Sequence, residues 1–165
     1  MKVIEAKVFR TVMIVCLLVA MPTWADSGTV DILTSALSSD TSVQMGGTTV
    51  TARGGNGTIT VVQSSGAPFV EGTSGRTLFT AFSKKSSTGF ELEADGLATF
   101  ASGDTLQLLF KRRTGDLAAG TSGEGTLYLP GGTGAFAGIS GECRYKVENL
   151  PGNWNVTIAH CSWKK

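Results

Sequence analysis

Charge, histidine and cysteine are all scarce in this sequence of 165 residues. Only 16% of the residues are Asp, Glu, Lys or Arg, and there are three cysteines and a single histidine, His160. This composition excludes a charged disordered chain, a coiled coil and a long-helix bundle. With one histidine and no Ser-His-Asp spacing, a hydrolase triad has no basis, and we assign no catalytic residue. Apolar residues still make up 41% of the chain, enough to bury a core.

Long apolar runs are also missing, apart from ten residues, 12–21, near the N-terminus. Basic residues precede this run, and Pro22 and then Thr23-Trp24-Ala25 follow it. As a helix, ten residues reach about 15 Å, half of a bilayer core of about 30 Å. Residues 1–25 are therefore predicted to be a signal peptide cleaved near Ala25, with an uncleaved anchor as the alternative. This predicts a periplasmic or secreted protein whose mature chain has no membrane span.

Basic residues do not gather into a patch. Residues 1–25 hold three basic residues and one acidic residue, so residues 26–165 keep eleven basic and twelve acidic ones, a net charge of −1. Because nucleic-acid binders normally show a basic face, no nucleic-acid partner is predicted. The one basic run, Lys111-Arg112-Arg113, is typical of a solvated strand edge. Arg112, however, shares a strand phase with Leu108 and Phe110, so it is also a candidate for an inward cation that reads a ligand.

Glycine, in contrast, is abundant, and every one of the 22 glycines lies after position 25. They have no three-residue period, which excludes collagen. Short alternating runs recur between Gly, Ser, Asn and Asp residues, and about eight to ten such runs predict an all-β barrel or sandwich. We expect the barrel domain over 48–165, after a Ser/Thr-rich lead-in over 26–47 in which a short helix is the weaker alternative. Turns are expected at 54–57, Asp95-Gly96, 102–104, 131–134 and Gly152.

Two cysteines, Cys143 and Cys161, remain after the predicted cleavage. Their midpoint, Gly152, lies in the turn sequence Asn149-Leu150-Pro151-Gly152-Asn153. In a regular hairpin about Gly152 the two cysteines would lie directly opposite each other, close enough for a disulfide. The alternatives are free thiols or a metal pair. With only one nearby histidine the zinc ligand set is incomplete, and we predict no metal.

The same register predicts which side chains point inward. Tyr145 and Val147 share the cysteine face with Thr157 and Ala159, which makes Tyr145 a second candidate ligand contact. His160 faces Arg144 on the outer side. Val156 and Ile158 then also lie outside, beside Arg144 and Lys146, which requires either a packed neighbouring element or a bulge. On another strand, Glu91 and Glu93 alternate with Phe90 and Leu92, and are interpreted as solvent-facing rather than as an acid–base pair.

The segment 131–138, GGTGAFAG, formally contains the dinucleotide fingerprint GxGxxA. That fingerprint needs a helix directly after it, whereas the residues from Ile139 onward alternate as a strand. No nucleotide and no other cofactor is therefore predicted. Gly131, Gly132 and Gly134 are interpreted as a tight turn between strands, with Phe136 as an anchor beneath it.

This turn and the strands around it resemble the bacterial relatives of the allene oxide cyclase and dirigent families. The resemblance lies in Gly123-Glu124-Gly125-Thr126-Leu127 leading into GGTGAFAGISG, and in the upstream 96–106, GLATFASGDTL. It covers about residues 96–145. It implies a closed, eight-stranded antiparallel barrel with a lipocalin-like interior. Cyclase or stereochemistry-guiding activity is implied only for the plant branches, and no functional residue is carried over from the motif.

Three functions follow as hypotheses. The first is an exported barrel that binds a small apolar or phenolic molecule, because a closed barrel with few charges can enclose one ligand. The second is a cyclase or isomerase that acts through the shape of its pocket. The third is a structural or adhesive surface subunit, suggested by the Gly/Ser/Thr-rich composition and one disulfide. Binding is favoured over catalysis.

Overall fold

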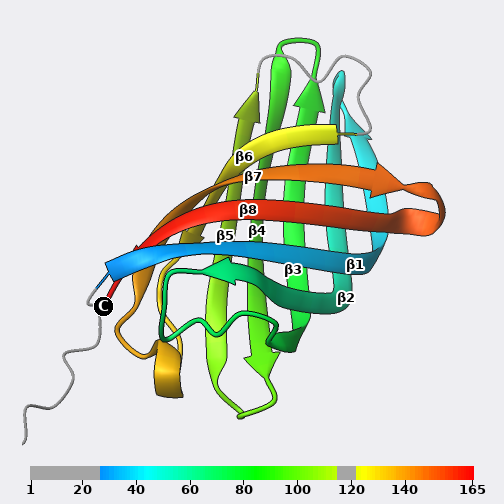
Figure 1. The fold of residues 1–165 in the computed structure, drawn as a ribbon. Coiled ribbons are helices and arrows are strands. Elements are labelled where there is room, and N and C mark those ends of the chain that lie inside the picture. Colours follow the sequence, from blue (N-terminus) through cyan, green and yellow to red (C-terminus); the bar gives the residue numbers. More distant parts are fainter. Residues whose placement is uncertain (1–26, 115–121) are drawn as a thin grey trace, which may run out of the picture.

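The computed structural model describes residues 27–114 and 122–165, which form one closed antiparallel barrel of eight strands (Figure 1). Each strand pairs with the next along the chain, and the last strand pairs with the first. The predicted all-β barrel is therefore confirmed. The predicted signal peptide, residues 1–25, lies outside the described residues. Among those that are described, no helix has the length and apolar character needed to cross a membrane.

The eight strands are joined by short connections and two 3₁₀ turns. The strands are β1 (Ser27–Met45), β2 (Thr48–Ser64), β3 (Ser74–Ser86), β4 (Gly89–Phe100), β5 (Thr105–Thr114), β6 (Ser122–Leu129), β7 (Ser140–Leu150) and β8 (Trp154–Lys164). The 3₁₀ turns are η1 (Gly134–Phe136) and η2 (Pro151–Asn153). Figure 1 shows β3, β4 and β5 running across the direction of β1, β7 and β8, so the two groups form facing walls.

The Ser/Thr-rich stretch that we expected as a lead-in is instead the first strand of the barrel. Residues 27–45 form β1, which pairs with β2 on one side and β8 on the other. Its inward residues Val30, Ile32 and Ala36 are buried. Serine and threonine suit the solvent-exposed face of such a strand. Because these residues are also common in loops, the composition of this stretch resembled that of a loose segment.

Two predicted turns are also wrong, because their glycines lie inside strands. Residues 54–57 are the middle of β2, and Asp95-Gly96 is the middle of β4. Gly55 is needed for close approach, since a Cβ there would lie only 2.6 Å from the ring of Phe79. The actual β1–β2 turn is Gly46-Gly47, where both residues have positive φ.

Other predicted turns are confirmed. Gly103 and Gly152 lie in the β4–β5 and β7–β8 connections. Gly131, Gly132 and Gly134 lie between β6 and β7, where Gly132 also bridges to Leu106 of β5. Beneath this turn Phe136 is buried, with its ring centroid 4.9 Å from that of Phe100 and 5.3 Å from that of Phe69. Phe136 thus lies beneath the turn, at the position that we predicted for it.

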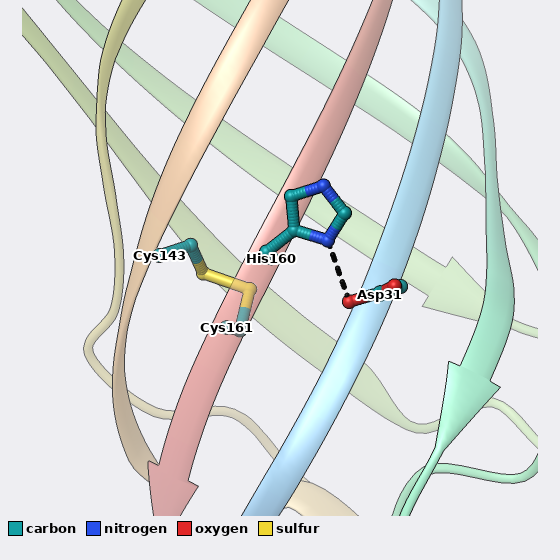
Figure 2. The surroundings of a disulfide bond; sticks show 4 residues. All are labelled: Asp31, Cys143, His160 and Cys161. Atoms are coloured by element: carbon teal, nitrogen blue, oxygen red, sulfur yellow. Dashed lines mark hydrogen bonds and ion pairs between the residues drawn. A yellow bond between two sulfur atoms is a disulfide. The ribbon is translucent and has the colours of Figure 1, made fainter.

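The β7–β8 hairpin has the predicted register. Cys143 lies directly opposite Cys161, and the two form a disulfide that points into the barrel (Figure 2). The pairing runs without interruption from Ser140↔Lys164 to Leu150↔Trp154, so the bulge that we considered is absent from this hairpin. Ile158 instead lies on the outer face between Lys146 of β7 and Leu33 of β1.

The largest fully buried side chains lie toward one end of the barrel, which we call the packed end. This end holds the β2–β3, β4–β5 and β6–β7 connections and the disulfide. Its buried side chains are large; they include Val30, Ile32, Ile59, Val61, Phe69, Phe100, Leu106, Leu127, Leu129, Phe136, Ile139 and Trp163. The other end, which we call the hairpin end, holds the β1–β2, β3–β4 and β7–β8 turns.

The disulfide leads to a first prediction. It closes a loop with a sequence separation of 18, so replacing both cysteines with alanine should lower the free energy of unfolding by about 3 kcal/mol. Urea unfolding of the oxidised protein and the double variant measures the difference. The oxidised protein should also weigh two protons less than its reduced form. Equal urea midpoints would contradict the stabilising role of the bond.

Candidate functional site

A cavity of about 360 Å³ lies in the hairpin end of the barrel, which places it within the size range of small-molecule sites. Residues from β1 to β5, β7 and β8 line it. Its walls combine aromatic and aliphatic side chains with a few polar groups. The apolar walls include Phe79, Phe90, Leu92, Phe110 and Val147.

The cavity exists because the inward positions at this end carry small residues. Ala36, Ala81, Ala94 and Gly96 all line it, where the packed end has Leu, Ile and Phe on the same faces. A barrel of eight strands is just wide enough for its interior side chains to fill it. Alanine and glycine at these inward positions therefore leave part of the interior unfilled.

Arg112 points into this space, as its strand phase predicted. It lies on β5, is only 8% exposed and contributes to the cavity wall. Its guanidinium carbon stands 5.4 Å from the ring centroid of Phe90, a cation–π contact. Inward-facing Gly123 of β6 provides room, because any Cβ there would collide with the guanidinium. Among the described residues, nothing accepts a hydrogen bond from the Arg112 Nε.

Tyr145, the second predicted candidate, lies beside Arg112. It is 5% exposed and packs edge-on against Phe110, with ring centroids 5.4 Å apart. Inward-facing Gly125 accommodates its ring. Burial raises the pKa of the Tyr145 phenol, and the nearby positive charge of Arg112 opposes part of that rise. The phenol therefore stays protonated at neutral pH and remains a hydrogen-bond donor.

The cavity wall also contains three charged residues that we did not predict from the sequence. Asp40 of β1 and Arg53 of β2 form an ion pair with 3.2 Å between Oδ2 and Nη2. Lys85 of β3 lies on the same wall. Asp40 sits in the segment that we had taken for a lead-in, and Arg53 directly precedes the segment that we had taken for a turn. Continuing the strand alternation through 54–57 would have placed Arg53 on the same face as Ile59 and Val61.

The remaining candidates lie outside the barrel. His160 is exposed on β8, where its Nδ1 is 2.9 Å from the Asp31 carboxylate of β1 (Figure 2). Arg144 is its neighbour on the other side, as the register predicted. Glu91 and Glu93 are exposed on the outer face of β4, which confirms their assignment to solvent. Since His160 is the single histidine of the chain, the cavity has no imidazole base for a nucleophilic triad.

The chemistry that this arrangement supports is recognition. A guanidinium and a protonated phenol offer hydrogen-bond donors inside an aromatic and aliphatic enclosure. Within ranges 27–114 and 122–165, no cluster of three or more His, Cys, Asp or Glu side chains is placed to hold a metal ion. Comparison of the sequence with protein-family models and with curated proteins finds no match.

The packing around Tyr145 gives a second prediction. In Gly125→Ala the new Cβ would lie 2.6 Å from the Tyr145 ring and 2.7 Å from the Lys111 carbonyl oxygen. Because a backbone oxygen cannot move aside freely, we expect a loss of about 1–3 kcal/mol in unfolding free energy. Glu124→Ala, at the exposed neighbouring position, is the control. Urea unfolding should separate the two variants, and equal stabilities would show that β6 is not tightly packed there.

The raised pKa of Tyr145 gives a third prediction. The folded protein holds the phenolic proton more tightly than the unfolded chain, whose tyrosine pKa is about 10. Above that pH the unfolded chain releases the proton first, so stability falls as pH rises toward the folded-state pKa. Tyr145→Phe should therefore lose less stability than the wild type between about pH 8 and pH 11. Urea midpoints at several pH values measure both slopes, and parallel slopes would refute a buried phenol.

Proposed function

We propose that this protein is an exported β-barrel that binds one small, mainly apolar or phenolic molecule inside its hairpin end. The cavity of about 360 Å³ is the observation that carries the proposal. Aromatic side chains wall it, and a small number of polar groups converge on it, which is the usual composition of a small-molecule site. The buried disulfide supports an oxidising compartment, consistent with a periplasmic or secreted location.

The resemblance to bacterial relatives of the allene oxide cyclase and dirigent families supports the same proposal. That resemblance implied a closed eight-stranded barrel with a lipocalin-like interior, and the chain has a barrel of this kind with an internal cavity. We therefore propose that the chain is related to those families.

A second candidate function is isomerisation or cyclisation guided by the shape of the cavity. This hypothesis required polar groups near an interior cavity, and Arg112 and Tyr145 are both there. The third hypothesis, a structural or adhesive subunit, is less well supported. A missing strand would favour this hypothesis, whereas a closed barrel counts against it, and β1 pairs with β8 along eleven residues and closes the sheet.

A matched pair of variants tests binding in the cavity, and this is our fourth prediction. Ala81 lines the cavity, whereas Ala52 is exposed on the outer face of β2. Ala81→Phe fills the cavity, and Ala52→Phe adds the same ring outside. The probes are 8-anilinonaphthalene-1-sulfonate and N-phenyl-1-naphthylamine, which share one aromatic body and fluoresce strongly in apolar surroundings.

The wild type should enhance the fluorescence of at least one probe with one-to-one stoichiometry. Ala81→Phe should weaken that binding at least tenfold, and Ala52→Phe should leave it unchanged. Circular dichroism and urea unfolding establish that both variants are folded. If neither probe binds the wild type, or if both variants bind as the wild type does, the cavity is not a binding site.

A further inference from the structure

The cavity wall carries more positively charged than negatively charged side chains. Besides the protonated Tyr145, the wall carries Asp40, Arg53, Lys85 and Arg112, three cations and one anion. Asp40 is already paired with Arg53. Within the described ranges, neither Lys85 nor Arg112 has a carboxylate within ion-pair distance. The cavity wall is therefore cationic, although residues 26–165 as a whole carry a net charge of −1.

Arg112 is the most deeply buried of these three cations. Arg112 as a residue is only 8% exposed, and a buried charge is costly unless it is paired and hydrogen-bonded. The Phe90 ring offsets only part of that cost. The Nε has no acceptor among the described residues. A group of this kind is retained at a cost in stability, which an incoming anion would relieve.

Two glycines bring Arg112 and Tyr145 together. Gly123 and Gly125 are two residues apart on β6, so they face the same side of the strand. Gly123 accommodates the guanidinium and Gly125 accommodates the phenol ring. The two donors consequently lie on one wall of the cavity, beside the rings of Phe90 and Phe110. A guanidinium fork with an adjacent hydroxyl donor matches the oxygens of a carboxylate or sulfonate.

We infer that the molecule bound in this cavity is an organic acid, with an apolar or aromatic body and an anionic head that Arg112 recognises with Tyr145 beside it. This inference rests on the proposed function and specifies its ligand class. It distinguishes an acid from a neutral phenol or hydrocarbon of the same size, which the cavity walls alone would accept.

The two naphthylamine probes test the inference, because they differ by one sulfonate group. The measured quantity is the ratio of their affinities, sulfonate over neutral probe, in each protein. Arg112→Gln should lower this ratio about tenfold or more, because it removes a charge-assisted hydrogen bond and leaves the apolar lining in place. Arg113→Gln is the matched control, since it removes the same charge from the exposed neighbouring position on β5. Its ratio should equal that of the wild type.

An unchanged ratio in Arg112→Gln would overturn the inference. That result leaves the proposed function standing, because both probes still bind in the cavity. The absence of binding of either probe to the wild type would instead remove the proposed function itself. If Arg112→Gln loses its β-sheet circular dichroism, Arg112→Lys carries the test. Lysine keeps the charge but lacks the fork, so the ratio should fall several-fold, and a wild-type ratio in that variant would contradict recognition by the guanidinium.

Discussion

Closure of the sheet is the constraint on which the rest of this structure depends. Once β8 pairs with β1, every second residue of eight strands points into one enclosed volume. The size of those residues then decides whether the interior is solid or hollow. Leucine, isoleucine and phenylalanine make the packed end solid, whereas alanine and glycine leave the hairpin end hollow.

The two ends of the barrel therefore differ, since the packed end holds most of the core and the hairpin end holds the proposed binding site. The packed end holds the aromatic cluster around Phe136 and the Cys143–Cys161 disulfide, which joins β7 to β8. A barrel whose core is well packed at one end can tolerate a destabilising buried charge at the other end. Arg112 is the clearest case, since its burial lowers stability unless something in the cavity compensates for its charge.

Local patterns in the sequence predicted the features that depend on one hairpin or one strand. The β7–β8 register, the disulfide and the inward direction of Tyr145 all followed from the turn about Gly152. The inward direction of Arg112 followed from alternation with Leu108 and Phe110. These predictions succeeded because side chains alternate with a period of two along any strand, whatever the distant partners are.

The failures came from glycines and from polar strands. A glycine marks either a turn or a close approach of two strands, and the sequence alone does not distinguish these two uses. Gly55 and Gly57 serve close approach, which becomes visible only when β1 and β3 lie beside β2. For the same reason Asp40, Arg53 and Lys85 were not recognised as neighbours. The pairing of β2 with β1 and β3 brings them together, from strands whose extent had been underestimated.

The central claim is that the hairpin end of this barrel is hollow and cationic. A high-resolution crystal structure of the protein without added ligand tests it most directly. We expect a cavity of about 360 Å³ inside the hairpin end, with Arg112 and Tyr145 on its wall. An interior filled completely by side chains, or an Arg112 side chain turned out to solvent, would contradict it.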